Sequence, residues 1–398
     1  MTPGPGIART PLPKGFTSAS VNCGVRKYRP DLGMIFSDRD CVAAGMFTEN
    51  TSKAACVLYS QKILPSSHVR AVVTNSGQAN AATGERGRVD NWKMAVAAAH
   101  AAGCLPHQVL TASTGVIGQH LEIEKIQEGL LNLAERASAH AEPFAVSILT
   151  TDLVPKTVTT TVKLSGGEIR ITGICKGSGM IHPNMATMLG YLLTDADIPV
   201  DMAKPLLQEA TQVSFNMISV DGDTSTNDSV FFLANGASEV KVESVDDMIL
   251  FRKALVEVAQ FLAQSIARDG EGATKLVEVS LQGAPDVDLA RRAARSIVLS
   301  PLIKSAIHGE DPNWGRILAR LGAEKVPEDC LSNMTLEIQD ATLFRSGAPA
   351  LFDRNEVRMR LKSDTVRIKV SLNSGAHEAT AWGCDLSKKY VDINAEYT

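Results

Sequence analysis

Hydrophobic residues recur along the chain with two spacings, one typical of helices and the other typical of strands. Apolar positions three and four residues apart predict helices over residues 91–103, 123–139, 246–270 and 284–298. Apolar runs rich in β-branched residues predict strands over residues 69–74, 158–164, 168–174, 230–235, 276–281, 334–339 and 366–372. Helices and strands are mixed without the strict alternation of a doubly wound sheet, so the pattern predicts the α+β class.

Glycines and a shift in composition divide this pattern into larger pieces. Gly103 is expected to stop the helix over residues 91–103, and Gly270 to supply a left-handed stop for the helix over residues 246–270. Gly166 with Gly167 predicts a hairpin turn between two strands. Between residues 280 and 300 the chain becomes more charged and less rich in alanine. We therefore expect a larger domain over residues 1-285 and a smaller C-terminal domain over residues 286-398.

Composition and charge narrow the class of protein. Of the 398 residues, 44% are hydrophobic and 21% charged, which is ordinary for a globular protein with a sizeable core. The net charge is -4 and the sequence pI about 6.1, so electrostatics favours neither nucleic acid nor an anionic membrane as partner. Seven scattered cysteines without C-x-x-C spacing indicate reduced thiols. With no secretory signal pattern and no apolar run of spanning length, the sequence predicts a cytoplasmic location.

Familiar site motifs are missing from the sequence. It contains no phosphate loop and no H-E-x-x-H, and the position two before Ser178 is Lys176 rather than the glycine of a nucleophile elbow. The stretch DGDTSTND (221–228) resembles a calcium loop, but its sixth and twelfth positions are Thr226 and Phe232 instead of glycine and glutamate. We therefore expect no metal site.

The segment KGSGMIHPNMATML (176–189) suits a self-cleavage reaction. Pro183 restricts the backbone before Thr187, and the small Ala186 leaves its carbonyl open to attack by the Thr187 hydroxyl. Hydrolysis of the resulting ester would leave Thr187 at a new N-terminus, where its own α-amine can act as base. A threonine in an apolar run is more often half-buried and bonded to backbone, and local pattern alone favours that ordinary role.

From PLPKGF near its start to INAEY near its end, the chain resembles the ornithine acetyltransferase family, also called glutamate N-acetyltransferases. The resemblance rests on long motifs in register: NSGQANAATG (75-84), ASTGVIG (112-118), TTDLVPK (150-156), KGSGMIHPNMATML (176-189), SVDGDTSTND (219-228), DGEGATK (269-275), HGEDPNWGRI (308-317) and YVDINAEY (390-397). It implies an α+β fold whose larger domain is layered α/β/β/α and carries the nucleophile, with a smaller C-terminal α/β domain.

The resemblance also implies how the chain is processed and assembled. The peptide bond between Ala186 and Thr187 would be cut, giving mature chains 1-186 and 187-398 that stay together as partners, and two such pairs would form a heterotetramer. Thr187 would be the nucleophile that carries the acetyl group.

Further site residues follow from the same motifs. Thr114 and Gly115 would form the oxyanion hole, although an STG triplet alone favours a turn or a helix N-cap. Substrate contacts would fall on Thr150, Lys176, Thr187, Glu271 and Asn394. We expect Lys176 to meet a substrate α-carboxylate and Glu271 the ornithine ammonium, with a structural ion pair between Lys176 and Glu271 as the alternative.

The implied reaction moves an acetyl group from N2-acetylornithine to glutamate by ping-pong kinetics, without a metal or organic cofactor. Acetyl-CoA as a second donor stays open on sequence grounds. One alternative is a self-processing aminopeptidase or amidase that passes the acyl group to water, and another is a non-catalytic amino-acid-binding protein.

Two further groups of side chains receive no catalytic role. The acidic residues of the 219–228 motif, Asp221, Asp223 and Asp228, are expected to form turns and bind backbone. Trp314 and Arg316 are expected to support the junction between the two chains or domains.

Overall fold

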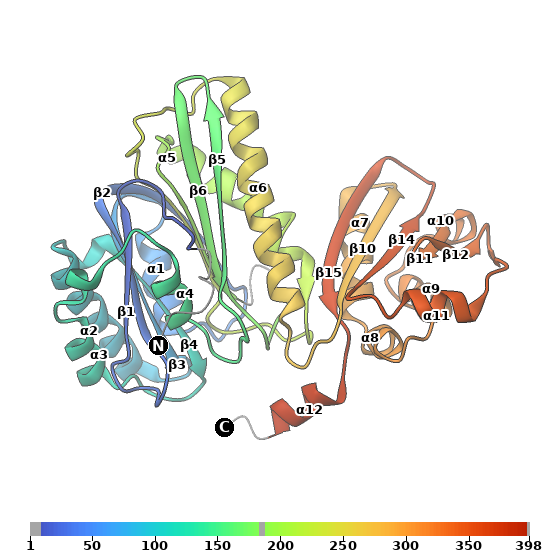
Figure 1. Ribbon diagram of the computed structural model, residues 1–398, viewed down its shortest axis with the longest axis horizontal. Coiled ribbons are helices and arrows are strands. Elements are labelled where there is room, and N and C mark those ends of the chain that lie inside the picture. Colours follow the sequence, from blue (N-terminus) through green and yellow to red (C-terminus); the bar gives the residue numbers. More distant parts are fainter. Residues whose placement is uncertain (1–8, 183–187, 396–398) are drawn as a thin grey trace, which may run out of the picture. The chain divides into compact units, whose positions relative to one another are not determined.

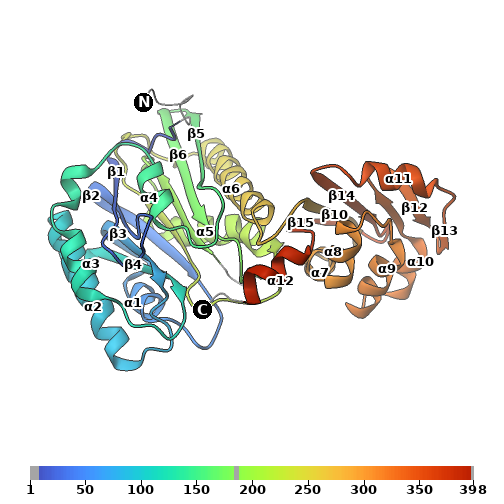
Figure 2. The same cartoon turned by 60° about the horizontal axis from the view of Figure 1, so that its bottom comes forward.

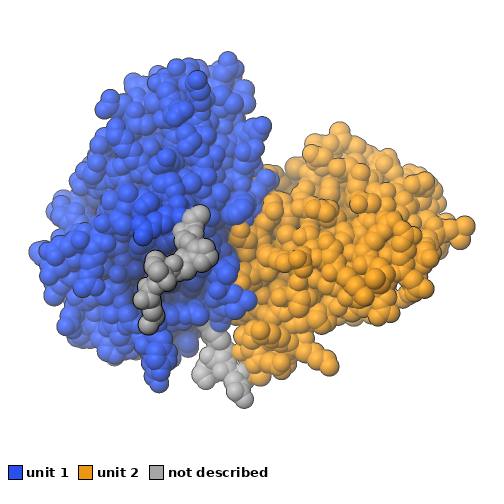
Figure 3. Space-filling model, in the orientation of Figure 1, with its two compact units in different colours: residues 1–177, 184–212, 224–262 blue, residues 178–183, 213–223, 263–398 orange. Residues whose placement is uncertain are grey.

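The computed structural model describes residues 9–182 and 188–395, which group by their contacts into two compact units (Figures 1 and 3). The first unit comprises residues 1–177, 184–212 and 224–262, and the second comprises residues 178–183, 213–223 and 263–398. Each unit is built around its own sheet.

The described strands of the first unit join in one eight-stranded sheet with the order β4-β3-β2-β9-β7-β6-β5, to which β1 adds by pairing with β2. Its strands are β1 (Phe16–Val21), β2 (Leu32–Phe47), β3 (Ser66–Gln78), β4 (Val109–Val116), β5 (Lys156–Leu164), β6 (Gly167–Lys176), β7 (Leu189–Thr194) and β9 (Ser229–Ala234). The pairs β3·β4 and β7·β9 are parallel, whereas β2·β3, β2·β9, β5·β6 and β6·β7 are antiparallel.

The long strand β2 joins two parts of this sheet. Its first part pairs with β1 up to Ser37, and residues 42–47 pair with β9. Strand β3 pairs with β2 up to Phe36 and again at Cys41 and Ala43. Between these parts the register shifts, and the residues from Asp38 to Asp40 are exposed. Such an irregularity bends a strand, so β2 can serve two sets of neighbours.

Helices cover both faces of this sheet, because its strands alternate their apolar side chains between the faces. Ile35 and Val72 belong to one hydrophobic cluster with α4, whereas Met34, Ala71 and Val73 belong to another with α2 and α3. Figures 1 and 2 show α1, α2 and α3 beside the β3–β4 end. The helical segments of this unit are α1 (Ala55–Ile63), α2 (Gly84–Ala102), η1 (Pro106–Gln108), α3 (Ile123–Leu130), η2 (Leu133–Arg136), α4 (Glu142–Ser147), α5 (Val200–Gln212) and α6 (Val245–Arg268), of which α6 belongs to it up to Leu262.

Helix α6 packs on the other end of the sheet. Leu262 and Val258 lie so close to Gly173 of β6 that a Cβ at that glycine would approach either side chain to 2.7 Å. Phe251 of the same helix meets Phe232 of β9 edge to face, with ring centroids 6.4 Å apart. The glycine therefore permits close helix–sheet packing.

The described strands of the second unit form a seven-stranded sheet with the order β13-β12-β11-β14-β10-β15-β8. Its strands are β8 (Ile218–Ser219), β10 (Leu276–Ala284), β11 (Thr335–Ile338), β12 (Ala341–Arg345), β13 (Ala348–Pro349), β14 (Thr365–Ser371) and β15 (His377–Cys384). Its helical segments are η3 (Phe215–Met217), α7 (Val287–Leu299), α8 (Pro301–His308), α9 (Trp314–Ala323), α10 (Glu328–Asn333), α11 (Arg354–Arg360) and α12 (Lys388–Ala395). Helix α7, whose N-terminus is capped by the Asp286 carboxylate, packs on β10 and β15.

The α+β class predicted from the sequence is confirmed: the structure has two sheets with helices packed on them. Each predicted strand coincides with a strand of the structure, and Gly167, at φ +143°, forms the predicted hairpin between β5 and β6. Strand β10, which precedes the expected domain boundary at residue 285, belongs to the second unit.

Two local helix predictions were wrong. The helix expected over 123–139 ends at Leu130 as α3, because Asn132 is left-handed at φ +58° and only a short 3₁₀ turn follows. Helix α6 ends at Arg268, and Gly270 does not supply a left-handed stop. A Cβ at Gly270 would lie 2.8 Å from Cys384 Sγ, so close packing explains that glycine instead.

Candidate active site

The expected nucleophile Thr187 and its neighbour Ala186 lie outside the described residues. The structure does describe the chain that follows them and the other predicted site residues. Downstream, Met188 is buried and β7 begins at Leu189. All residues of β7 are buried between β6 and β9. The apolar run after Thr187 is thus a core strand, which fixes the chain on that side of the expected cut.

The proposed oxyanion pair lies near the C-terminal end of β4, a strand at one end of the sheet order, and not in a turn or N-cap. Thr114 and Gly115 are opposite Ser76 and Gly77 of the parallel strand β3. Gly115 has φ +132°, and a Cβ there would lie 2.2 Å from the carbonyl carbon of Gly77. A side chain is therefore excluded, which leaves the backbone at this position partly exposed.

The buried side-chain amide of Asn227 binds the backbone of β4. Asn227 donates hydrogen bonds from Nδ2 to the carbonyl oxygens of Ser113, 2.8 Å away, and Ala79, 2.6 Å away. Ser113 directly precedes the proposed oxyanion pair, so Asn227 holds the backbone of β4 at the site.

Thr150 and Lys176 are brought together, as expected for two substrate contacts. Lys176 Nζ donates to Thr150 Oγ1 over 2.7 Å and lies 3.6 Å from Asp152 Oδ2. Asp152 Oδ1 accepts from Lys156 Nζ at 2.8 Å and from the backbone N–H of Gly177 at 2.7 Å. The carboxylate therefore fixes both lysines and the chain that follows Lys176.

This carboxylate is ionised despite being buried. Burial by itself raises the pKa of Asp152, but the charges of Lys176 and Lys156 and the hydrogen bonds from Lys156 and the Gly177 N–H outweigh it and hold the pKa well below its usual range. The side chains of Asp152 and Lys156 are almost completely buried, and that of Lys176 is 8% exposed. Lys176 is the member of the group with access to solvent, and so to a substrate.

Arg26 links β3, the strand paired with β4, to Thr150. Its guanidinium donates to the backbone carbonyls of Leu149 and, over 3.4 Å, Thr150. Its methylene groups lie against Gly77, where a Cβ would approach Arg26 Cγ to 3.1 Å. The Arg26 backbone N–H donates in turn to the buried Asp31 carboxylate over 2.7 Å. The arginine therefore holds the two neighbouring parts of the site in register.

The second unit carries the other two predicted substrate residues, and they contact each other. Asn394 Nδ2, on α12, donates to Glu271 Oε2 at 2.8 Å. Glu271 is 7% exposed, and a Cβ on Gly179 would lie 2.3 Å from its carboxyl carbon. The glycine of the K-G-S-G-M stretch thus leaves room for this carboxylate.

The loop that carries Glu271 is held by Asp385. Its carboxylate accepts from the backbone N–H groups of Thr274 and Lys275, from Thr274 Oγ1, and from His308 Nδ1 at 2.7 Å. Burial raises the pKa of Asp385, but these hydrogen bonds outweigh it and lower the pKa. The loop is therefore fixed by an ionised group.

The predicted site residues thus form two groups. Thr114, Gly115, Thr150 and Lys176 belong to the first unit, and Glu271 and Asn394 belong to the second. Lys176 pairs with Asp152 and Glu271 with Asn394, while the alternative pairing of Lys176 with Glu271 stays open.

Sequence comparison identifies the family. The sequence profile of the ArgJ family matches residues 17–398. The chain belongs to the ArgJ family. The arginine biosynthesis bifunctional protein ArgJ of Dehalococcoides mccartyi (strain CBDB1) is 46% identical over 393 residues, covering 97% of this chain and 96% of that protein. The protein of the same name from Synechocystis sp. is 44% identical over 400 residues, covering 97% of each.

The ArgJ family assignment confirms the predicted resemblance and makes the chain an acyltransferase of arginine biosynthesis. Among solved structures, the arginine biosynthesis bifunctional protein argJ from Bacillus halodurans is 41% identical with a TM-score of 0.51. That match covers 53% of this chain and 100% of the solved chain.

Three residues of this ArgJ-family chain that position the site were not predicted. Asp152 lies in the motif TTDLVPK, where a lysine four residues later was a usable signal for an ion pair. Asn227 lies in a motif assigned only to turns. Arg26 lies in a polar loop that carries no recognisable pattern, and its contacts with Leu149 and Thr150 reach across more than a hundred residues.

Trp314 and Arg316 have contacts within the second unit. The Trp314 ring lies 5.2 Å from that of Phe344, and Arg316 donates to the carbonyl of Leu302. These contacts join α9 to β12 and α8. A role at a junction between chains or domains stays a prediction.

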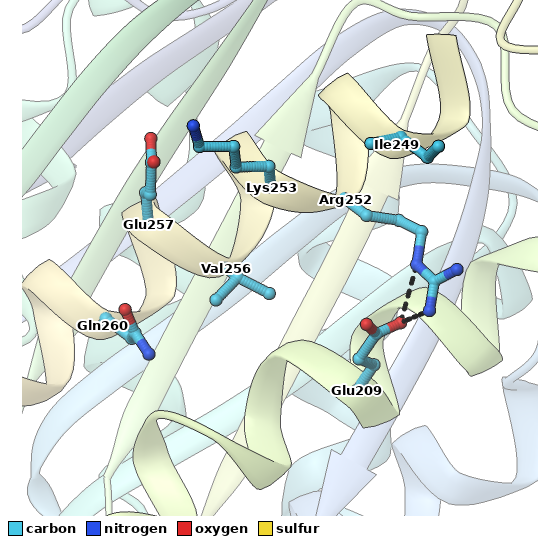
Figure 4. Close-up of a pocket in the computed structure, with 7 residues that line it drawn as sticks. All are labelled: Glu209, Ile249, Arg252, Lys253, Val256, Glu257 and Gln260. Carbon is cyan, nitrogen blue, oxygen red and sulfur yellow. Dashed lines mark hydrogen bonds and ion pairs between the residues drawn. The ribbon is translucent and has the colours of Figure 1, made fainter. Parts of the chain in front are cut away.

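A pocket of about 450 Å³ in the first unit lies apart from these residues (Figure 4). It is lined by Glu209 and by residues of α6, and Arg252 Nε donates to Glu209 Oε2 across 2.8 Å. None of the predicted site residues that the structure describes lines it, so we assign it no part in acetyl transfer.

Within the described ranges no helix combines the length and the apolar character needed to span a membrane. In those same ranges no cluster of three or more His, Cys, Asp or Glu side chains is arranged to hold a metal ion. All seven cysteines are described, and each is a free thiol.

Proposed function

We propose that this chain cleaves itself between Ala186 and Thr187 and then uses Thr187 to move an acetyl group from N2-acetylornithine to glutamate. The observation that carries the proposal is the extent of the match with the solved Bacillus halodurans chain. That whole chain corresponds to 53% of this one, and residues 187–398 are 212 of 398 residues, or 53% of the sequence. A relative whose solved chain has the length of one expected product supports cleavage.

Cleavage proceeds by an internal acyl shift. The Thr187 hydroxyl oxygen attacks the Ala186 carbonyl carbon, and the peptide C–N bond breaks as the nitrogen takes up a proton. Water then hydrolyses the ester. The products are a carboxylate on Ala186 and a Thr187 with a free hydroxyl and a free α-amine, whose ordinary pKa of about 7.7–8.0 leaves a useful neutral fraction.

Acetyl transfer reuses the same hydroxyl. With the α-amine as base, Thr187 attacks the acetyl carbonyl of N2-acetylornithine, and ornithine leaves with its α-amine. The α-amine of glutamate then attacks the acetyl ester, which releases N-acetylglutamate and restores the hydroxyl. Thr114 and the Gly115 N–H would donate to the oxyanion in both steps, since β4 presents an open backbone there.

Charge complementarity supports the assignment of the substrate contacts. N2-acetylornithine and glutamate share an α-carboxylate, and Lys176, anchored by Thr150 and Asp152, offers a cation with partial access to solvent. The ornithine side chain ends in an ammonium, for which Glu271, oriented by Asn394, offers an anion. Because the first half-reaction releases ornithine and the second admits glutamate, one site serves both substrates in turn.

Intact-mass measurement of the purified protein tests the central event. We expect two polypeptides, 1–186 and 187–398, and a single full-length polypeptide in Thr187→Ala. A wild-type chain that remains full-length while exchanging acetyl groups at a normal rate would refute the proposal. Release of acetate at the same rate with and without glutamate would instead favour the amidase alternative.

The name of the curated relatives, bifunctional protein, favours a second activity. We extend the proposal to acetyl-CoA as a further acetyl donor to glutamate. The test is release of CoA thiol from acetyl-CoA in the presence of glutamate, with Thr187→Ala as control. Thiol release no faster than in the control would refute this second activity while leaving the first intact.

Location and assembly complete the proposal. We place the enzyme in the cytoplasm, as its reduced cysteines suggest, and expect a heterotetramer of two 1–186 and two 187–398 chains. Light scattering in solution would then give twice the 42.5 kDa of one precursor.

A further inference from the structure

The segment from Ser178 to His182, just upstream of the expected cut, is held by hydrogen bonds to other loops of the second unit. Described residues up to Gly177 and those from Met188 to Gln212 group with the first unit, whereas residues from Ser178 to His182 group with the second. In sequence, this short segment ends four residues before Ala186. Its anchoring therefore bears on how the Ala186–Thr187 bond is presented.

The Asp221 carboxylate is the main anchor. Its Oδ2 accepts the backbone N–H of Met180 at 2.6 Å, and its Oδ1 accepts the backbone N–H of Ile181 at 2.8 Å. Oδ1 also accepts the backbone N–H of Asp223 at 3.3 Å. The partly buried Asp221 carboxylate therefore connects the loop that contains Asp223 to the backbone N–H groups of Met180 and Ile181.

The segment held in this way has an unfavourable backbone conformation. Met180 has φ +56°, a left-handed geometry that a non-glycine residue adopts only when its surroundings compensate for the cost. Its side chain is 41% exposed and so contributes little packing to offset that cost. The charge-assisted hydrogen bonds from Met180 and Ile181 to Asp221 provide the compensation.

Other contacts complete the attachment on either side of Met180. The Ile181 carbonyl accepts the Val220 N–H at 2.7 Å, and the Ser178 carbonyl accepts the Glu271 N–H at 3.0 Å. Ser178 Oγ donates to the carbonyl of Asp269 at 2.7 Å. The segment from Ser178 to Ile181 is therefore fixed, with Asp221 as its charged anchor.

We infer that Asp221 is a positioning residue for self-cleavage: by holding Met180 and Ile181, it fixes the direction from which the chain approaches the Ala186–Thr187 bond. The inference rests on the proposed function, since it assumes that this bond is cut. In this role Asp221 acts through the backbone of Met180 and Ile181 and not as a catalytic residue. An intramolecular attack depends on alignment of the hydroxyl with the carbonyl, so loosening the approach slows the reaction.

The test follows the conversion of newly made full-length chain to the two products by intact mass over time. We compare wild type, Asp221→Asn and a matched control, Asp223→Asn, whose exposed carboxylate lies two residues away in the same loop. Replacing the charged acceptor of backbone N–H groups should slow cleavage by about tenfold or more. Asp223→Asn should cleave at the wild-type rate.

Two further measurements separate positioning from a general loss of structure. Thermal unfolding reports whether Asp221→Asn is folded, and acetyl exchange per cleaved molecule should match wild type, because the anchor is needed for cutting and not for the transfer. Met180→Val provides a second route: the β-branched side chain is disfavoured at positive φ and disturbs the segment without altering the carboxylate. It should also cleave slowly.

The outcomes distinguish this inference from the proposed function. An uncleaved wild-type chain would refute the proposed function itself. A cleaving wild type with folded Asp221→Asn cut at the wild-type rate would overturn the inference alone. If Asp221→Asn does not fold, Met180→Val decides: wild-type cleavage in that variant would overturn the inference, and slow cleavage would support it.

Discussion

Asn394 Nδ2 lies 2.8 Å from Glu271 Oε2, although 123 residues separate the two in the sequence. The amide donates to the carboxylate and leaves the second carboxylate oxygen, Oε1, for another donor. A carboxylate oriented in this way is ready to receive an ammonium group without first losing side-chain freedom.

Replacing Glu271 should therefore weaken substrate binding. In Glu271→Gln we expect the KM for N2-acetylornithine to rise about tenfold or more, because a hydrogen bond to a charged partner contributes ~1.5–3 kcal/mol. Steady-state kinetics on the cleaved protein measures the change. Glu356→Gln, in a surface ion pair with Arg360, is the control. Unchanged Michaelis constants for both substrates would remove Glu271 from the list of contacts.

Asp152→Asn should destabilise the fold. The substitution removes the buried carboxylate that forms an ion pair with Lys156, whose side chain is 1% exposed, and we expect a loss of about 3–5 kcal/mol in the free energy of unfolding. Denaturant titration gives the value. Adding Lys156→Met removes the lysine charge as well and should restore part of the loss. A single variant as stable as wild type would show that the buried pair contributes little.

Gly115→Ala should impair acetyl transfer. The added Cβ would lie 2.2 Å from the Gly77 carbonyl carbon, so β4 must shift and the oxyanion donor moves with it. Loss of one such donor lowers kcat by about 10²–10³-fold. Gly118→Ala is the matched control, since Gly118 also has positive φ, +85°, but has no atom within 4 Å of the added carbon. Equal losses in the two variants would indicate backbone strain rather than a displaced donor.

Acid should destabilise the second unit through His182. Burial and the nearby Arg295 lower the pKa of His182 from 6.5 to about 4. Ser219 and Asp223 are further polar neighbours. Above pH 6.5 the ring is neutral whether the chain is folded or unfolded. As the pH falls from 6.5 to 4, only the unfolded chain gains the proton, and the folded state loses stability.

The melting temperature at pH 7 and pH 4.5 measures this effect. The decrease should be smaller in His182→Gln, which keeps a polar side chain but does not titrate. An identical decrease in the two proteins would assign the acid sensitivity to other groups.

The parts of the fold that could be predicted are those with a local cause. Strand β6 and its hairpin with β5 follow from alternating apolar residues around Gly166 and Gly167, and α2 ends at Gly103, which is left-handed at φ +63°. The resemblance to a known family also assigned Thr150 and Lys176 to one site, and the structure joins them by a hydrogen bond.

What escaped prediction depends on contacts distant in sequence. The left-handed Met180 is stabilised by Asp221, 41 residues later, and nothing in the local run K-G-S-G-M indicates it. Arg26 donates a hydrogen bond to the carbonyl of Leu149, which lies 123 residues later in the sequence. Asp221 was correctly expected to bind backbone, but its partners could be named only from the structure.

The order of strands in the first sheet has a consequence for the two products of the proposed cleavage. Strands β7 and β9 come after residue 187 in sequence, yet they lie between β2 and β6, which come before it. Each fragment is thus bordered by backbone hydrogen bonds to the other along β2·β9 and β6·β7. Parting them would require opening the sheet, so mixing two isotopically distinct preparations of cut enzyme should yield no hybrid pairs. Each fragment would stay paired with the fragment cut from the same precursor for as long as the molecule stays folded.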